Sequence, residues 1–181
     1  MKHRIFVAID IPEELKNAAE AHIGEFYKNK LVRVVERENW HITVAFCGYL
    51  DDEKLNKLKE IARKITKETK SFELIPDKII FAPPKRTPRM VWLTFKNSPE
   101  FSKISKLFSK FNQEAREPLL HLTLARFEEK HYSNLKPLLP QDGIDLKNET
   151  KSFMVKSINI MESHLSPKGP KYELLCQNYL R

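Results

Sequence analysis

Glycine, cysteine and long apolar runs are scarce in this chain, and each scarcity excludes a class of protein. Only four glycines are present, at positions 24, 48, 143 and 169. They lie too far apart to form the phosphate-binding glycine loop of a P-loop protein or a dinucleotide-binding fold. Two cysteines are too few for a disulfide scaffold, and no Cys-x-x-Cys or His-Glu-x-x-His pattern predicts a zinc site. The sequence leaves open whether Cys47 and Cys176 lie close together.

Apolar runs are also short. The longest run near the N-terminus spans Ile5–Ile9 and is followed by Asp10. This is shorter than the apolar core of a signal peptide, and a membrane-spanning helix needs about 20 apolar residues. We therefore expect a soluble, cytoplasmic protein that makes no membrane contact, with a monomer as the default state.

Positive charge exceeds negative charge. The chain has 32 Lys and Arg against 24 Asp and Glu, which gives a formal net charge of +8. Such an excess favours an anionic partner, such as a nucleic acid or a nucleotide. Lysine-rich helix faces that serve only solubility give the same excess, so charge alone does not identify a partner.

Helical and strand-like segments alternate along the 181 residues, a length typical of one domain. Pro12 begins a predicted helix that extends to Phe26, a second helix spans residues 52–67, and Ser98 caps a third. Strand-like segments lie between and after these helices, near Val32–Val35, His41–Cys47, Phe72–Phe81, Met90–Phe95, His121–Phe127, Phe153–Met161 and Tyr172–Tyr179. The strand-rich C-terminal part does not fit a βα repeat, so the pattern predicts an α+β fold with mainly antiparallel sheets.

One short motif occurs twice, 80 residues apart. The copies are His41-Ile42-Thr43-Val44 and His121-Leu122-Thr123-Leu124. On a strand, residues i and i+2 lie on the same face, so each copy presents a histidine and a threonine on one side and buries its apolar pair on the other. Two such strands side by side would place two imidazoles and two hydroxyls around one pocket.

This set of side chains suits phosphodiester hydrolysis. Histidine titrates near pH 6.5, so one imidazole can accept a proton from the nucleophile while the other donates a proton to the departing oxygen. The hydroxyls of Thr43 and Thr123 can donate hydrogen bonds to the phosphate oxygens. The chemistry requires neither a metal ion nor another cofactor. The other four histidines lack a threonine at i+2 and receive no chemical role.

Paired His-x-Thr-x motifs make the chain resemble the two-histidine (2H) phosphoesterase superfamily. Within it, the chain resembles the RNA 2′,3′-cyclic phosphodiesterases, also called 2′–5′ RNA ligases. The resemblance is carried by four segments, residues 4–9, 41–48, 121–126 and 161–172. Val44 and Cys47 depart from the family, which usually has leucine there. The resemblance implies a single bilobal domain over residues 1–181, in which two pseudo-symmetric halves flank a central cleft, helices lie outside, and each lobe carries one motif.

The resemblance also implies an activity. The expected reaction is hydrolysis of a 2′,3′-cyclic phosphate, on an RNA end or a free nucleotide, to a 2′-phosphate. Reversal of the same chemistry would join RNA ends by a 2′–5′ bond. We expect His41 to be the proton donor and His121 the proton acceptor, although the pseudo-symmetry leaves the opposite assignment open.

Further cationic and aromatic residues are candidates for substrate binding. Phe46 and Arg126 each lie five residues after a motif histidine. The family pattern makes Arg126 a phosphate or base contact, and Phe46 either stacks on the terminal base or belongs to the core. Because five is odd, a regular strand would turn both away from the histidines, and either a bulge or a strand that ends near Ala125 would turn them back. Arg89 and Lys168, in two basic loops, are candidates for phosphates further along the RNA.

Two alternative functions stay open at this stage. The chain could be a non-catalytic RNA-binding module, or a 2H phosphodiesterase that acts on a different cyclic phosphate or on an RNA 3′ end. The intact histidine and threonine in both motifs favour an enzyme. Product analysis separates the possible substrates.

Overall fold

The computed structural model describes residues 2–112, 119–146, 149–167 and 169–181. Within these residues, nine strands form one sheet in the order β11-β10-β1-β3-β7-β6-β5-β8, with β2 paired to β7. The strand pairs in this sheet are antiparallel. The predicted α+β fold with mainly antiparallel strands is therefore confirmed.

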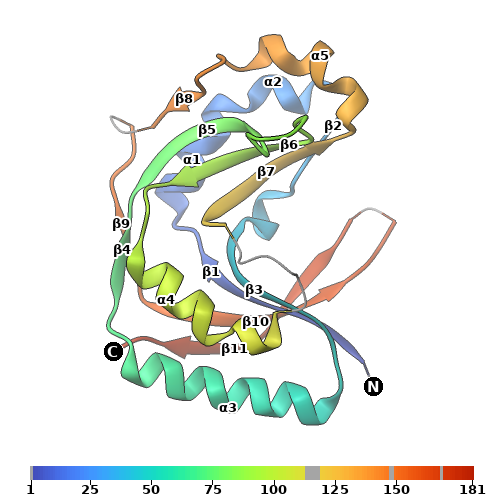
Figure 1. Cartoon of the computed structure of the whole chain (residues 1–181). Helices are drawn as coiled ribbons and strands as arrows, with labels where there is room; N and C mark the ends of the chain where they lie inside the picture. The colour runs from blue at the N-terminus through green and yellow to red at the C-terminus, as the bar shows by residue number, and fades with distance from the viewer. Residues whose placement is uncertain (1, 113–118, 147–148, 168) are drawn as a thin grey trace.

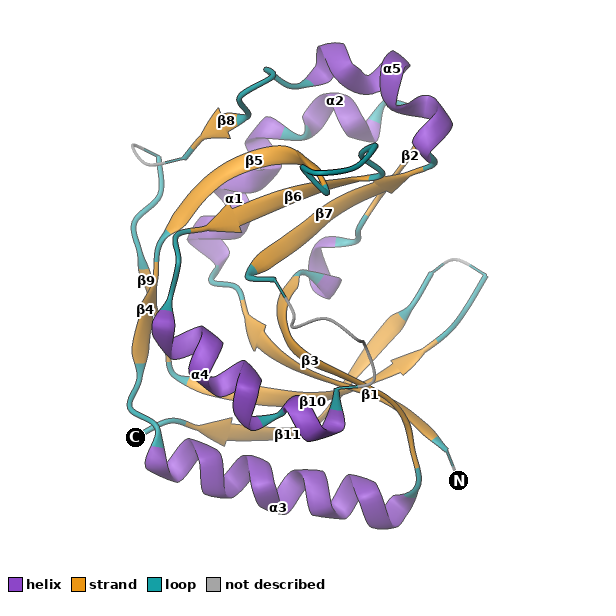
Figure 2. Cartoon of the chain, in the orientation of Figure 1, coloured by secondary structure: helices purple, strands orange, loops and turns teal. Residues whose placement is uncertain are grey.

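The sheet has two arms that meet at one residue pair, Ile42 of β3 with Leu122 of β7. The first arm contains β1 (His3–Asp10), β3 (His41–Leu50), β10 (Ser157–His164) and β11 (Lys171–Tyr179). The second arm contains β2 (Val32–Val34), β5 (Pro76–Ala82), β6 (Met90–Phe95), β7 (His121–Phe127) and β8 (Ile144–Asp145). Figure 2 shows the arms as two curved groups of strands, one above the other.

Segments from both ends of the chain build the first arm. Figure 1 shows the blue and cyan strands β1 and β3 beside the red strands β10 and β11. The two arms are therefore not consecutive halves of the chain. Two predicted strands are each divided in the structure, because β4 (Phe72–Leu74) precedes β5 and β9 (Phe153–Val155) precedes β10. Strands β4 and β9 pair with each other in a separate small sheet.

Helices cover the backs of both arms. The α-helices are α1 (Glu13–His22), α2 (Gly24–Tyr27), α3 (Asp52–Glu68), α4 (Pro99–Leu107) and α5 (Tyr132–Leu135). Short 3₁₀ turns are η1 (Arg37–Asn39), η2 (Ser109–Phe111), η3 (Glu129–His131) and η4 (Lys136–Leu138). Figure 1 shows α3 along the first arm and α1 and α2 behind the second. The single helix predicted from Pro12 to Phe26 is interrupted at Ile23, where α1 ends.

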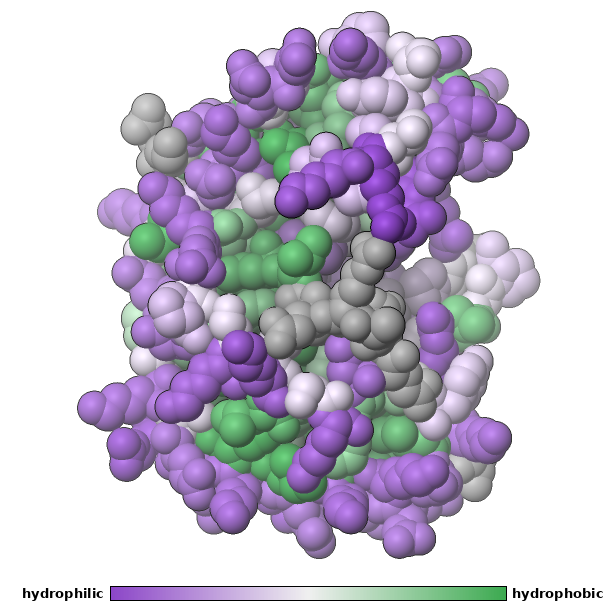
Figure 3. All heavy atoms as spheres, viewed as in Figure 1, coloured by the Kyte–Doolittle hydropathy of each residue, from purple (hydrophilic) through white to green (hydrophobic). Residues whose placement is uncertain are grey.

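The sequence explains the ends and the buried side of α3. Asp51 caps the helix by accepting a hydrogen bond from the Lys54 backbone N–H. Leu55, Leu58 and Ala62 are buried against the sheet. The lysines on the other sides are mostly exposed, and Figure 3 shows hydrophilic residues along the lower end of the view, where α3 lies. Those lysines therefore form a solvated helix face.

Two absences follow from the described residues. Within those ranges, none of the helices has the length and apolar composition that a membrane span requires. Cys47 and Cys176 are both free thiols; the first is buried and the second is partly exposed. Burial raises the pKa of the Cys47 thiol to about 12, so this thiol stays protonated at neutral pH.

Candidate active site

The two histidine motifs meet where the arms join. Because Ile42 pairs with Leu122 in antiparallel register, His41 and Thr123 lie on one side of this pair, and Thr43 and His121 lie on the other. The pairing residues are buried, so the alternation places the histidines and threonines together on the opposite face. We call this side of the sheet the histidine face. The structure brings together the two imidazoles and two hydroxyls that the sequence predicted.

The same hydrogen bond orients both imidazoles. The Nδ1 atom of His41 lies 2.7 Å from the Asn39 carbonyl oxygen, and that of His121 lies 2.8 Å from the Leu119 carbonyl oxygen. A carbonyl oxygen can only accept a hydrogen bond, so each Nδ1 carries the proton and donates it. In the neutral ring, Nε2 is therefore the basic atom available for proton transfer.

His121 lies in a partly desolvated and electropositive environment. Its ring stacks on Trp92 at 3.9 Å between centroids, with 27° between the planes. Burial lowers the pKa of His121 to about 4, and the charges of Arg126 and His41 add to this effect. The Leu119 carbonyl acts in the opposite direction, but burial dominates. His121 is therefore neutral at pH 7.

His41 has different neighbours. Its ring contacts Phe6 and Tyr172, with centroids 4.8 Å and 5.2 Å away. Burial lowers the pKa of His41 and Arg126 lowers it further, whereas the Asn39 carbonyl and the Asp10 carboxylate raise it. Asp10 lies directly across from His41 in the β1–β3 pair. Among the described residues, a carboxylate thus counteracts burial at His41 but not at His121.

The Asp10 carboxylate is itself held in place. The amide nitrogen of Asn159, a buried residue of β10, donates a hydrogen bond of 2.6 Å to Asp10 Oδ2. A small pocket of about 30 Å³ beside these residues is lined in part by Asp10, His41 and Tyr172. A volume of that size holds roughly one or two waters. This pocket is therefore too small to enclose a nucleotide.

The two threonines occupy matching places. Thr43 is buried, and its hydroxyl lies 3.2 Å from His41 Nε2, to which it donates because Nδ1 keeps the ring proton. Thr123 is partly exposed and lies across from Trp92 in the β6–β7 pair. Both hydroxyls are therefore beside a histidine on the same face.

A bulge three residues after each histidine explains how the odd spacing of five residues still places Phe46 and Arg126 on the histidine face. In the β1–β3 pair, Thr43 and Ala45 have partners on β1, but Val44 between them has none. In the β6–β7 pair, Thr123 and Ala125 have partners on β6, but Leu124 between them has none. The extra residue reverses the alternation beyond it. Consequently Phe46 and Arg126 are exposed on the histidine face, whereas the preceding alanines are fully buried.

Each bulge carbonyl has its own hydrogen-bond donor. The hydroxyl of Ser105, on α4, donates to the Val44 carbonyl at 3.1 Å in a buried contact. The backbone N–H of Val35 donates to the Leu124 carbonyl at 2.8 Å. Buried backbone oxygens without a partner are costly, so these donors stabilise the bulges.

Arg126 and Phe46 lie where the sequence required them. Although the Arg126 side chain reaches solvent, partial desolvation lowers the pKa of its guanidinium, and Arg33 and Arg89 lower it further. Arg126 Nη1 also lies 3.4 Å from Met90 Sδ. Phe46 is 37% exposed, which agrees with a surface position rather than a core position.

Arg89 and Lys168 are the two remaining candidates for substrate binding, and only Arg89 is among the described residues. Arg89 is exposed, with Nη1 4.0 Å from Glu129 Oε1, and its charge acts on Arg126. Lys168 lies outside the described residues. Trp92, Asp10 and Tyr172 were not predicted as site residues, because no spacing pattern connects them with the histidines. Tyr172 lies within a family-like segment, which was the one available signal.

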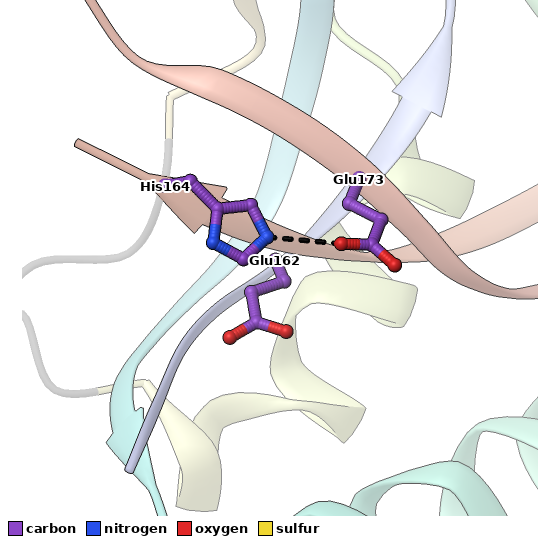
Figure 4. Close-up of side chains that lie close together, drawn as sticks. All are labelled: Glu162, His164 and Glu173. Carbon is purple, nitrogen blue, oxygen red and sulfur yellow. Dashed lines mark hydrogen bonds and ion pairs between the residues drawn. The ribbon is translucent and has the colours of Figure 1, made fainter. Parts of the chain in front are cut away.

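A histidine and two glutamates of strands β10 and β11 form a cluster (Figure 4). Glu162, His164 and Glu173 place one ligand atom each within 4.8 Å of one another. His164 Nε2 lies 3.0 Å from Glu173 Oε2, and His3 Nδ1 lies 2.9 Å from Glu162 Oε1. These contacts tie β10 to β11 and to β1, so we interpret the cluster as structural ion pairs.

Known proteins are similar to this chain in sequence and in fold. A family model described as LigT like Phosphoesterase matches residues 9–92. An RNA 2′,3′-cyclic phosphodiesterase of Methanocaldococcus jannaschii is 33% identical over 178 residues, covering 95% of this chain and 98% of that protein. One from Methanothermobacter thermautotrophicus is 31% identical over 180 residues, covering 95% of this chain and 96% of that protein.

Solved structures show the same fold. The apo form of E. coli LigT superposes with a TM-score of 0.79, covers 99% of this chain and 98% of its own, and is 22% identical. Its complex with 3′-AMP superposes with a TM-score of 0.77 over 99% of both chains. By the identity and coverage of its relatives, the chain belongs to the two-histidine phosphoesterase family that includes the RNA 2′,3′-cyclic phosphodiesterases.

Proposed function

We propose that this protein hydrolyses the 2′,3′-cyclic phosphate of an RNA end or nucleotide to a 2′-phosphate. The observation that carries the proposal is the matched pair of histidines, each with Nδ1 fixed on a backbone carbonyl and Nε2 left to exchange protons. Relatives that are 27–33% identical over most of this chain are named for this activity.

In the proposed mechanism, the histidines have opposite roles. His121 Nε2 takes a proton from water, whose oxygen attacks phosphorus. The bond from phosphorus to the 3′ oxygen breaks, and that oxygen takes a proton from His41 Nε2. The products are a 2′-phosphate and a 3′-hydroxyl. Solvent then returns a proton to His41 and removes one from His121.

The two environments support this assignment. His121 is neutral at pH 7 because its pKa lies near 4, and a base must start without the proton. Burial lowers the pKa of both histidines, but at His41 the Asp10 carboxylate acts against this effect, and a bound phosphate anion would act in the same direction as Asp10, so we assign the donor role to His41. Exchange of these roles gives the reverse reaction, 2′–5′ ligation, which we include in the proposal.

The threonines and Arg126 bind the phosphate in this scheme. The Thr43 and Thr123 hydroxyls donate to the non-bridging oxygens, on which negative charge accumulates. Arg126, on the same face, supplies a positive charge, and the exposed ring of Phe46 offers a surface on which a base can stack. Since the two imidazoles supply both acid and base, no metal ion is required. We further propose one bilobal domain with one motif per lobe, acting as a cytoplasmic monomer.

The test is incubation with 2′,3′-cyclic AMP in excess chelator, followed by assignment of the product. We expect 2′-AMP from the wild type and severe loss of activity in both His41→Ala and His121→Ala. Full activity in either variant contradicts the mechanism. RNA binding without turnover would favour a non-catalytic module. A 3′-phosphate product would mean that the 2′ oxygen, and not the 3′ oxygen, is the leaving group.

A further inference from the structure

Trp92 places a large aromatic ring against His121 from the neighbouring strand. It lies on β6 directly across from Thr123 of β7, and directly opposed residues of antiparallel strands lie on the same face. His121 lies opposite Thr94, two residues further along β6, so Trp92 is its diagonal neighbour. Diagonal neighbours across a strand pair are within reach of aromatic side chains. The strand register therefore explains why this indole meets the imidazole.

The stack and one hydrogen bond together fix the imidazole of His121. The ring centroids of Trp92 and His121 lie 3.9 Å apart with 27° between the planes, so the rings meet face to face. The bond from Nδ1 to the Leu119 carbonyl sets the direction in which the imidazole points, and the indole sets the plane in which it lies. Trp92 is itself only 7% exposed, so its own position is fixed by packing. Nε2 of His121 therefore has a defined direction.

Trp92 acts on the site through its ring face. Among the described residues, no group accepts a hydrogen bond from its buried Nε1 atom. The face of an aromatic ring carries negative partial charge and attracts a cation, and the indole of tryptophan does so most strongly. The attraction grows when the pair is shielded from water. Trp92 is therefore placed to favour a positively charged imidazole over a neutral one.

The charged side chains around His121 act in the opposite sense. Among the described residues, the titratable groups that act on it are Arg126 of its own strand and His41 of β3, and both disfavour a further positive charge. At His41, the Asp10 carboxylate lies across the strand pair and favours the protonated ring. In the described part of the chain, an aromatic face thus takes at His121 the place that a carboxylate takes at His41.

We propose that Trp92 is a positioning residue, which holds His121 in the plane that a base requires and stabilises the imidazolium formed when Nε2 takes a proton from water. The inference rests on the proposed function, in which His121 is that base. In this step the proton moves from water to Nε2, and the ring gains one positive charge while already in contact with the indole. The same indole shields the ring from water, which keeps His121 neutral before the step.

Fluorinated tryptophans test the ring face without changing the packing. One, two or three fluorines on the benzene ring withdraw electron density stepwise, while the shape of the indole stays nearly the same. NMR of the His121 Cε1–H follows its titration. Weaker stabilisation of the imidazolium lowers the pKa of His121, so the midpoint should move stepwise to lower pH, by about one pH unit over the series. The kcat for 2′,3′-cyclic AMP should fall in parallel by about tenfold.

The variant Trp92→Phe is the matched control, because the chain has only two tryptophans. Fluorine then reaches only Trp40, whose Nε1 donates to the Val35 carbonyl, and the titration of His121 should no longer respond to it. Trp92→Phe keeps a smaller aromatic face, so it should lose less kcat than Trp92→Leu. KM should change little in both variants, because the role of Trp92 is exerted through His121.

Two results would overturn the inference. One is a titration of His121 that does not respond to fluorination in the wild type, even if Trp92→Leu lowers activity through packing. The other is an equal response in Trp92→Phe. The proposed function fails separately, if the wild type does not hydrolyse 2′,3′-cyclic AMP. The NMR titration needs no turnover, so it still decides whether Trp92 stabilises the protonated ring of His121.

Discussion

In each arm of the sheet, a histidine at the start of a strand donates Nδ1–H to a carbonyl two residues earlier, and a bulged residue follows three positions later. The side chains around this repeated backbone differ. His41 contacts Phe6 and Tyr172 and has Asp10 across the strand pair. His121 stacks on Trp92, and no carboxylate in the described part of the chain raises its pKa. A symmetric backbone thus carries two chemically unequal histidines, which is what an acid and a base require.

The largest expected effect comes from removing either histidine. His41→Ala and His121→Ala should each lower kcat for 2′,3′-cyclic AMP by about 10²–10⁴-fold, the usual contribution of general acid–base catalysis. His22→Ala, which removes a histidine paired with Glu149, is the control and should keep wild-type activity. Steady-state kinetics at pH 7 makes the comparison. If only one of the two variants lost activity, the two histidines would not act together in the reaction.

Removal of the two hydroxyls should have a smaller, matched effect. Thr43→Val and Thr123→Val each remove one hydrogen-bond donor to the charged phosphate, so we expect kcat to fall about 10²-fold in each. Without substrate, Thr43 instead donates to neutral His41 Nε2, and this contact favours the unprotonated ring, so only Thr43→Val should in addition shift the pH profile of kcat/KM. Identical pH profiles in both variants would contradict that difference between the arms.

The bulges should differ in their response to mutation. Ser105→Ala leaves the buried Val44 carbonyl without its donor, so the free energy of unfolding should fall by about 1–3 kcal/mol. The matching Leu124 carbonyl is bound by backbone and has no side chain to remove. Urea denaturation measures the change, with Ser102→Ala on the same helix as a control expected within about 0.5 kcal/mol. An unchanged stability in Ser105→Ala would mean that the bulge does not need this donor.

The subtlest expected effect is a shift in pH dependence. Asp10 raises the pKa of His41, so Asp10→Asn should lower it. Because the acid must be protonated, activity is lost as the pH rises through the pKa of His41, and the alkaline limb of kcat/KM should move to lower pH. The acid limb, set by His121, should stay in place. Asp142→Asn, in an exposed loop, serves as the control. Movement of the acid limb instead would assign Asp10 to the other histidine.

The repeated motif made the histidine face predictable. Alternation along a strand predicted that His41 and Thr43 share a face, and the buried Ile42 and Leu122 confirm it. The odd spacing to Phe46 and Arg126 called for either a bulge or an early end of the strand, and the structure contains a bulge after each histidine. Features of this kind depend only on residues that are neighbours in the sequence, so they can be predicted without knowing the fold.

Long-range pairing could not be predicted in the same way. Nothing local connects β1 with β10, or Arg33 with Arg126, since these residues come together only through strand order. The chain also changes sheets at Ile75, within a segment whose apolar residues predicted one continuous strand. Trp92 is one apolar residue among several in its strand, and only the pairing with β7 places it under His121.

The central claim is that His41 is the acid and His121 is the base, and a substrate that needs no acid tests it most directly. In a nucleoside phosphodiester whose leaving group is p-nitrophenol, the departing anion is stable without a proton. We predict that His41→Ala hydrolyses this ester within about tenfold of the wild-type rate, whereas His121→Ala loses about 10²–10⁴-fold. The opposite pattern, with activity kept in His121→Ala and lost in His41→Ala, would contradict the account.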